Sequence, residues 1–212
     1  MGLFLKKSVP NANIGVWEIS ESVDELYQRL TLTPAETEIF SALTSESRKL
    51  HWLSYRMILP HLIDWHNVSG ISYDQYGKPF LDNGVRHISV THSGKYSALI
   101  ASRTNSVGID IERISEKIMR LRHKFLMPQE LELLNKSSDP RIYYLYWAAK
   151  EAIYKLHGKR DILFKDNIFI HPFDLNPMEG NFEGKIISQG MQKHFRLNYL
   201  IFDDYVLVYL MD

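Results

Sequence analysis

The sequence predicts an α+β protein organised in two halves. Segments with the alternation of strands are interspersed with segments of helical periodicity, and each half contains helices and ends in a pair of strands. A short polar connection, Arg-Thr-Asn-Ser at 103–106, separates two predicted strands near the middle of the chain. We therefore expect an N-terminal half at residues 1–104 and a C-terminal half at residues 105–212.

The composition excludes several classes of protein. The chain has 212 residues with 45% hydrophobic content, which is ordinary for a globular protein. Its 25 basic residues balance 25 acidic ones, so nothing indicates a broad nucleic-acid-binding surface. The absence of cysteine excludes a disulfide framework, a thiolate zinc site and a cysteine nucleophile.

The chain also lacks the sequence signals of export. No run of about 18 apolar residues occurs, and the first residues do not follow the order of a signal peptide. We therefore expect a cytoplasmic protein that neither spans nor binds a membrane. We also expect it to be a monomer.

The N-terminal half shows several helix starts after an alternating strand at 14–19, the first of them leading into a helix to about Leu30. Thr33 before Pro34 has the pattern of an N-cap followed by proline at the first helical position. Ser45 or Ser47 begins a longer helix with four basic residues: Arg48, Lys49, His51 and Arg56. Such a run usually marks a solvated face, and the alternative is a phosphate-binding role for Arg48 and Arg56.

Two small polar segments follow this helix. Tyr-Gly-Lys-Pro-Phe at 76–80 precedes a turn expected at 82–84, and its glycine and proline predict a stiff loop that holds Lys78. Residues 87–102 have the pattern of strand, small polar turn and strand, with Thr91, His92 and Ser93 at the turn. A lone histidine at such a turn is more often a surface or hydrogen-bonding residue than a ligand-binding one.

The strand at 107–112, Val-Gly-Ile-Asp-Ile-Glu, carries two acids on one face. Alternation places Gly108, Asp110 and Glu112 together, with the two acidic side chains roughly 7 Å apart and space beside the glycine. Burying such acids without a partner costs free energy, so we expect a bound cation to neutralise them. Carboxylate oxygens are hard ligands, which favour Mg²⁺. The alternative is an edge strand whose acids face water.

The clearest helix starts at residues 137–140, Ser-Ser-Asp-Pro, and ends at Gly158. Four of its residues share a face: Trp147, Glu151, Tyr154 and Lys155. The simplest account of Glu151 and Lys155 is a surface pair one helical turn apart. Strands are expected near 168, at 184–188, at 195–202 and at 205–211, the last two forming a hairpin over Asp203 and Asp204.

Four motifs occur in one order: Gly-Lys-Pro at 77–79, Thr-His-Ser at 91–93, Gly-Ile-Asp-Ile-Glu at 108–112, and Trp-Ala-Ala-Lys-Glu-Ala-Ile-Tyr-Lys-Leu-His-Gly at 147–158. Together they resemble the 4′-phosphopantetheinyl transferases of the Sfp type, over the chain from about residue 48 to 170. The resemblance implies two similar α+β halves that form a pseudo-dimer within one chain. It also implies coenzyme A and Mg²⁺ at the cleft between them.

The resemblance assigns roles to individual residues. It makes Asp110, Glu112 and Glu151 the magnesium ligands, with Glu151 and Lys155 as the catalytic residues. The expected coenzyme A ligands are Arg48, Arg56, Lys78, Thr91, His92, Lys150 and Lys155. Glu130 matches an acidic position of the family after Phe125, where Lys124 stands in place of the more usual arginine, and its role stays open.

The implied reaction transfers the 4′-phosphopantetheine group from coenzyme A to a serine of an acyl or peptidyl carrier protein and releases adenosine 3′,5′-bisphosphate. Glu151 would act as the base, directly or through a metal-bound water, and Lys155 would stabilise charge on the phosphates. We expect the acidic carrier to dock on residues 114–133, where basic and apolar residues alternate. The alternatives are a noncatalytic coenzyme A or nucleotide-binding protein and a magnesium-dependent phosphoesterase.

Overall fold

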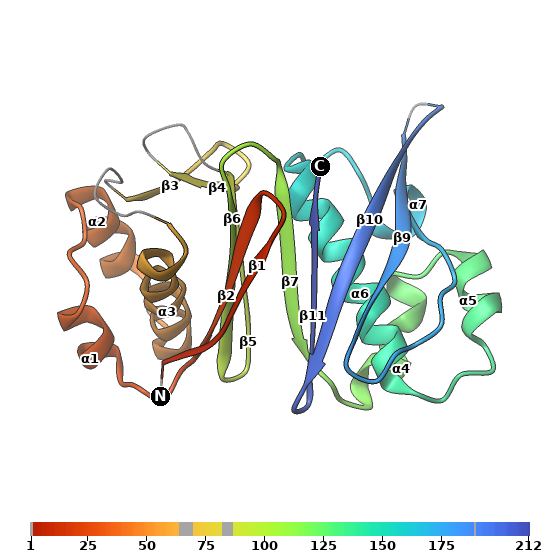
Figure 1. Ribbon diagram of the computed structural model, residues 1–212, viewed down its shortest axis with the longest axis horizontal. Coiled ribbons are helices and arrows are strands. Elements are labelled where there is room, and N and C mark those ends of the chain that lie inside the picture. The colour runs from red at the N-terminus through yellow and green to blue at the C-terminus, as the bar shows by residue number, and fades with distance from the viewer. Residues whose placement is uncertain (1, 64–69, 82–86, 189) are drawn as a thin grey trace. The chain divides into compact units, whose positions relative to one another are not determined.

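The computed structural model describes residues 2–63, 70–81, 87–188 and 190–212, so the turn predicted at 82–84 lies outside the described residues. The chain forms two compact units, Met1–Val107 and Gly108–Asp212, each with a sheet of its own (Figure 1). This mixture of helices and strands confirms the predicted fold class. The similarity of the two halves as a pseudo-dimer stays a prediction.

The first unit has a six-stranded antiparallel sheet in the order β1-β2-β6-β5-β4-β3. Its elements are β1 (Leu3–Val9), β2 (Ala12–Glu18), α1 (Val23–Gln28), α2 (Pro34–Ala42), α3 (Glu46–Leu62), β3 (Ile71–Tyr73), β4 (Pro79–Leu81), β5 (His87–Ser93) and β6 (Tyr96–Ser102). The helices lie on one side of this sheet (Figure 1). Apolar side chains of α3, among them Leu53, Ile58 and Leu59, pack on the sheet and form the core.

Strand β1 was not predicted from the sequence. It pairs with β2 along its length, and Asn11 in the connecting turn has a positive φ of 64°. Its residues alternate between half-buried and exposed, and it includes Lys6 and Lys7. A strand at the edge of a sheet has this weak apolar pattern because pairing with its neighbour, not burial, holds it in place.

The predicted helix starts of this unit are confirmed. Thr33 caps α2 by accepting a hydrogen bond from the backbone N–H of Glu36, whose carboxylate accepts the N–H of Thr33 in return. Ser45, the first of the two predicted candidates, is the N-cap of α3. These starts depend on local hydrogen bonds, which explains why the sequence reveals them.

A buried ion pair connects three elements of the first unit. Arg56 on α3 donates from Nε to Glu36 Oε1 over 2.9 Å, and both side chains are almost fully buried. The same oxygen accepts the backbone N–H of Ile71 in β3, and the guanidinium lies over the ring of Trp52. Glu36 therefore ties α2 to both α3 and β3.

We predict that Arg56→Met destabilises the protein by about 3–5 kcal/mol, because the Glu36 carboxylate would stay buried without its cation. Chemical denaturation measures this loss. The matched control is Arg48→Met in the same helix, where the side chain is exposed, and its effect should stay within about 0.5 kcal/mol. Equal stability of the two variants would contradict the structural role of Arg56.

The second unit has a five-stranded sheet in the order β7-β11-β10-β9-β8. Its elements are β7 (Val107–Arg113), α4 (Lys117–Leu121), a 3-10 helix (Arg122–Lys124), α5 (Pro128–Leu134), α6 (Pro140–His157), α7 (Phe164–Asn167), β8 (Ile168–Ile170), β9 (Glu179–Ser188), β10 (Met191–Phe202) and β11 (Tyr205–Met211). Helix α6 packs on this sheet, and its apolar residues, among them Leu145, Ala149 and Ile153, form the core with α4, α5 and the strands (Figure 1).

The predicted bounds of α6 and the predicted turn of the last hairpin are confirmed, whereas β10 begins at Met191, earlier than the predicted 195. Asp139 is the N-cap of α6, and Gly158 ends it in the left-handed conformation with φ 73°. Strands β10 and β11 pair from Phe202 and Tyr205 outward, with Asp203 in the turn at φ 50°. Positive φ favours glycine, and aspartate is one of the residues that tolerates it.

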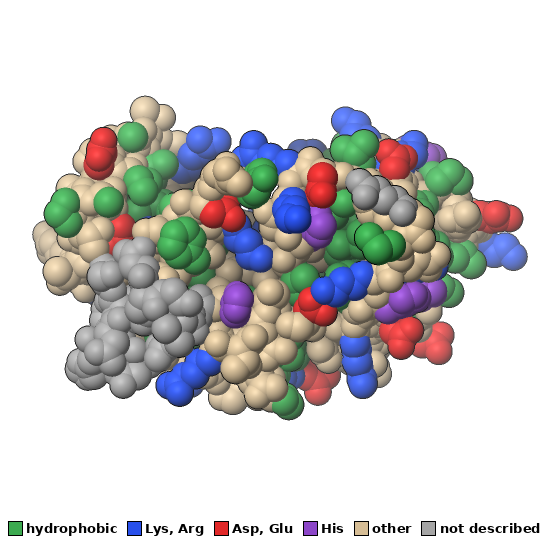
Figure 2. Space-filling model, turned by 90° about the horizontal axis from the view of Figure 1, so that it is seen from above, with side chains coloured by type: hydrophobic (Ala, Val, Ile, Leu, Met, Phe, Trp, Pro, Cys, Tyr) green, Lys and Arg blue, Asp and Glu red, His purple; other side chains and the backbone are tan. Residues whose placement is uncertain are grey.

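The exposed side chains fit the balanced composition. On the face in Figure 2, basic and acidic side chains are interspersed, without one large patch of either sign. Among the described residues, no helix combines the length and the apolar character that a membrane crossing requires.

Candidate active site

Gly108 sets the distance between strand β7 and helix α6. A Cβ atom at this position would lie 2.0 Å from the backbone oxygen of Ala152, so no larger residue fits without moving the helix. Alternation places Asp110 and Glu112 on the same face of β7 as Gly108, and this face is turned toward α6. The space that the sequence suggested beside the two acids is therefore filled by the backbone of α6.

Asp110 is buried and bound to a lysine of α6. Lys155 Nζ donates to Asp110 Oδ1 over 2.6 Å and to the backbone oxygen of Ile109 over 3.2 Å. The Asp110 side chain is 5% exposed and that of Lys155 is 26% exposed. The simple prediction of a surface pair between Glu151 and Lys155 is thus incomplete, because the direct partner of Lys155 is Asp110.

Glu112 is oriented by an aromatic residue whose contact the sequence did not predict. Trp147 Nε1 donates to Glu112 Oε1 over 2.8 Å. The indole ring itself packs edge-on against Phe125 and also contacts Phe164. The sequence placed Trp147 on the same helix face as Glu151, and this shared face was the signal that it belongs to the site.

Glu151 lies one helical turn after Trp147 and one turn before Lys155. Burial raises the pKa of its carboxyl group to about 7, and the negative charges of Asp110 and Glu112 act in the same direction, while Lys155 opposes them. The three carboxylates are therefore close enough to repel one another. A bound cation would relieve this repulsion.

The donor set suits Mg²⁺, which prefers carboxylate oxygens. Among the described residues, however, no three histidine or acidic side chains converge closely enough to hold one ion. Asp110 is engaged by Lys155, and Glu112 by Trp147. The magnesium site at Asp110, Glu112 and Glu151 stays a prediction that the chemistry of the donors supports.

Lys150, expected to contact coenzyme A, is instead a core residue. Its ammonium group is fully buried and donates to Glu130 over 2.6 Å and to the backbone oxygens of Phe164 and Ile168. All three N–H donors are used, so a contact with a ligand is incompatible with this geometry. Burial lowers the pKa of Lys150, and the Glu130 carboxylate opposes this shift.

Glu130, whose role the sequence left open, is the partner that makes this lysine possible. It also accepts the backbone N–H groups of Met127 and Ile170 over 2.7 Å and 2.8 Å. Glu130 thereby ties α5 to α6 and β8. In the first unit, Glu36 makes the same kinds of bond to Thr33, Arg56 and Ile71.

Lys78 lies in the stiff loop that the sequence predicts. Asp74 accepts the backbone N–H groups of Tyr76 and Lys78 over 2.8 Å and 2.9 Å, and Gly77 has a positive φ of 87°. The lysine side chain is partly buried, which lowers its pKa, while Asp74 opposes the shift. β4 pairs with β5 at Phe80 and His87, and continuing this register places Lys78 near Ser89.

Thr91 and His92 are the two residues before the last residue of strand β5, and they are not members of the turn. The turn consists of Gly94 and Lys95, because Ser93 still pairs with Tyr96. As consecutive strand residues, Thr91 and His92 point to opposite faces of the sheet. His92 is exposed, and its ring stacks on that of His51 from α3, with centroids 4.0 Å apart.

The two arginines expected to bind coenzyme A have different environments. Arg56 is buried in its ion pair with Glu36, and this geometry is incompatible with the expected ligand contact. Arg48 is exposed and lies one helical turn before His51. Because the ring of His51 stacks on His92, Arg48 and His92 both lie near His51. The side chain of Arg56 is instead directed to Glu36.

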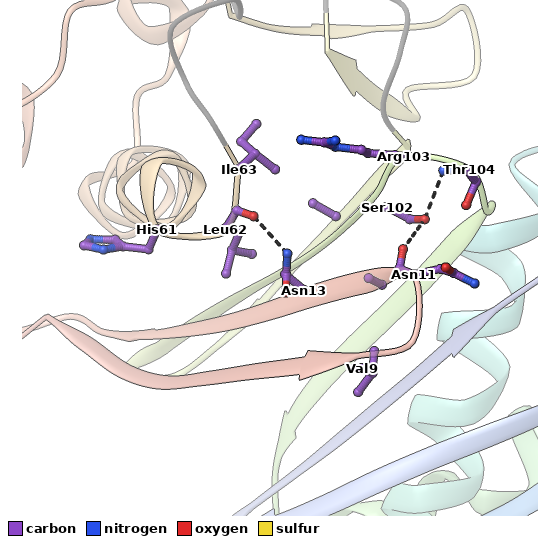
Figure 3. A pocket seen from close by; sticks show the side chains of 11 residues that line it. Val9, Asn11, Asn13, His61, Leu62, Ile63, Ser102, Arg103 and Thr104 are labelled. Atoms are coloured by element: carbon purple, nitrogen blue, oxygen red, sulfur yellow. Dashed lines mark hydrogen bonds between the residues drawn. The ribbon is translucent and has the colours of Figure 1, made fainter.

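A cavity of about 510 Å³ in the first unit contains none of the predicted site residues. It lies where β6 ends (Figure 3), and by the length of this strand that end is roughly 20 Å from the turn at Gly94. Two bonds lie within its lining: Asn13 donates to the oxygen of Leu62, and Ser102 to that of Asn11.

Strand β7 and helix α6 carry three acidic side chains and one lysine where the two elements face each other, and Lys155 bonds directly to Asp110. Such a set suits a cation and a phosphate-bearing ligand. Residues 106–209 match the 4′-phosphopantetheinyl transferase superfamily. This part of the chain is therefore similar to that superfamily, which confirms the resemblance carried by the motifs at 108–112 and 147–158.

Three curated proteins show the same relationship. The chain is 34% identical over 89 residues to the 4′-phosphopantetheinyl transferase gsp of Aneurinibacillus migulanus, covering 41% of this chain and 37% of that protein. It is 31% identical over 96 residues to the 4′-phosphopantetheinyl transferase HetI of Nostoc sp., covering 41% and 40%. A Synechocystis sp. protein provisionally named for the same activity is 33% identical over 96 residues, covering 42% and 39%. The chain thus spans about two fifths of the length of these relatives.

We predict that Gly108→Ala destabilises the second unit by about 1–3 kcal/mol or more, because the added methyl group meets a backbone oxygen that cannot rotate away. Urea denaturation measures the loss. Gly184→Ala in β9 is the control, since its methyl group would meet the flexible end of Ile170 at 2.9 Å and should cost less. A smaller effect at Gly108 than at Gly184 would show that β7 and α6 do not approach as described.

Proposed function

We propose that the protein is a magnesium-dependent 4′-phosphopantetheinyl transferase. It transfers the 4′-phosphopantetheine group from coenzyme A to a serine of an acyl or peptidyl carrier protein. The serine oxygen forms a bond to the β-phosphorus of coenzyme A, and the pyrophosphate bond breaks. The serine proton passes to a base, and adenosine 3′,5′-bisphosphate leaves.

One observation carries this proposal. Strand β7 approaches α6 closely at Gly108, Asp110 bonds to Lys155, and the charges of Asp110 and Glu112 act on Glu151, all within residues that match the superfamily. Phosphoryl transfer needs positioning and charge neutralisation more than covalent chemistry. A site of acids and one lysine, in a chain without cysteine, suits this requirement.

Glu151 and Lys155 have different tasks in the proposed reaction. Glu151 accepts the proton of the serine hydroxyl, directly or through a water molecule. Lys155 uses two N–H groups for Asp110 and Ile109, and its third has no partner among the described residues, so it is available for a phosphate oxygen. Asp110, Glu112 and Glu151 would hold Mg²⁺, which supplies positive charge for the pyrophosphate.

Coenzyme A would contact the first unit through Arg48, Lys78, Thr91 and His92. Arg48 is an exposed cation, and His92 is an exposed residue that becomes a cation when it is protonated. Lys78 lies on a rigid loop. Thr91 faces the side of the sheet opposite to His92, so only an extended ligand that passes the end of β5 meets both. Coenzyme A, with phosphates at both ends of its ribose, is such a ligand.

The carrier protein would dock on residues 114–133 mainly through charge. Two of the apolar residues expected at this contact, Ile118 and Leu126, belong to the core of the second unit, whereas Met119 and Leu121 are only partly buried. Lys117, Arg120 and Lys124 are exposed. Such a basic segment attracts an acidic partner over a distance and loses this attraction as salt increases.

We predict that the purified protein, incubated with an apo carrier protein, coenzyme A and Mg²⁺, adds the mass of one 4′-phosphopantetheine group to the carrier. Intact mass spectrometry measures the product. A carrier whose acceptor serine is replaced by alanine is the control. Release of adenosine 3′,5′-bisphosphate without a mass change would indicate a phosphoesterase, and coenzyme A binding without turnover a noncatalytic protein.

We predict that Mg²⁺ stabilises the protein through the three acids, by about 2.7 kcal/mol at one hundred times the Kd. Glu151→Gln should remove most of this stabilisation, because the site loses a charged ligand. Thermal melting with and without Mg²⁺ measures it, and Glu132→Gln on the exposed side of α5 is the control. A full response to Mg²⁺ in Glu151→Gln would exclude this residue as a ligand.

A further inference from the structure

His51 is fixed against the hairpin of β5 and β6. Its Nε2 lies 3.0 Å from the backbone oxygen of Gly94, and because a carbonyl oxygen only accepts, this nitrogen carries the hydrogen. Its ring lies parallel to that of His92, with an interplanar angle of 6° and centroids 4.0 Å apart. One edge of His51 is thus bound to the turn, and one face covers His92.

The helix that carries His51 is held at the same place by a second polar contact. Ser54, one turn further along α3, bonds through its hydroxyl to Ser97, which is the register partner of His92. The Ser54 hydroxyl also donates to the backbone oxygen of His51. In the same turn, the backbone oxygen of Lys95 accepts the backbone N–H of Ile19, the residue that follows β2. The position of His51 relative to His92 is therefore fixed by bonds from α3 to the turn and to β6.

We propose that His51 is a positioning residue, which holds the imidazole of His92 in one orientation for a phosphate group of coenzyme A. This inference rests on the proposed function, because that function makes His92 a coenzyme A ligand. An exposed histidine at the end of a strand otherwise samples several rotamers, and ordering it upon binding weakens affinity. Stacking on a fixed ring removes this loss before the ligand arrives.

The contacts of His51 separate this role from that of a direct ligand. Its Nε2 is used by Gly94, and its ring face is turned to His92. The contact that His92 receives is the flat ring of His51, whereas the hydrogen bond to Gly94 acts on His51 itself and helps to hold that ring in place. Arg48, one turn earlier on the helix and exposed, can add charge to the same anion without replacing the ring.

Three substitutions of His51 test the inference. We expect His51→Ala and His51→Gln to weaken coenzyme A binding about 3- to 10-fold, since both lose the stacked ring, although glutamine can still donate to Gly94. His51→Phe should bind nearly as well as the unchanged protein, because it keeps a flat ring. Calorimetric titration with coenzyme A measures the Kd, and His61→Ala at the exposed end of α3 is the control.

A double substitution decides whether the effect passes through His92. In a His92→Ala background, His51→Ala should cause no further loss of affinity, because there is no imidazole left to position. The proposal would be overturned if the two losses of affinity were additive. It would also be overturned if His51→Phe bound coenzyme A weakly, or if His51→Ala bound it as well as the unchanged protein. If the protein binds coenzyme A but transfers nothing, the proposed function fails while the Kd values still decide this inference. Absence of coenzyme A binding to the unchanged protein would overturn both.

Discussion

The close approach of strand β7 to helix α6 at Gly108 is the constraint on which the candidate site depends. A strand and a helix normally keep the distance that their side chains impose, whereas here a backbone oxygen of Ala152 occupies the place of a side chain. This contact lets Lys155 reach the buried Asp110, and it lets Trp147 reach Glu112. Burial raises the pKa of Glu151, and the charges of Asp110 and Glu112, which act in the same direction, are a further result of the same short distance.

The two units share a hydrogen-bonding arrangement around a buried glutamate, which supports the expectation of two similar halves. In each, a glutamate in the first turn of a short helix accepts a backbone N–H from the residue three positions earlier and another from a short strand. Each glutamate also pairs with a buried cation on the long helix, Arg56 in one unit and Lys150 in the other. Both cations had been expected to bind coenzyme A, and both instead connect the elements of their own unit.

Local patterns of the sequence predicted the helix caps, the last hairpin and the acidic face of β7, because each depends on neighbouring residues alone. The partner of Trp147 lies far away in the chain, which periodicity does not reveal. Strand β1 pairs with the neighbouring β2, but it has only the weak apolar pattern of an edge strand. A signal for the burial of Lys150 did exist: it lies four residues after Tyr146 and three before Ile153, both fully buried. A lysine on the core side of a helix requires an acidic partner, and Glu130 was the unexplained acid.

The order of strands in the second sheet has a consequence for biosynthesis. Among the described strands, β11 is the one neighbour of β7, and α4 to α7 and β8 to β10 lie between them in the chain. The strand that carries Asp110 and Glu112 therefore stays without a sheet partner until residues 205–211 have been translated. Loop closure over such a separation is slow. A ribosome-bound chain that stops before β11 would expose the acidic strand, so the candidate site is the last part of this unit to mature.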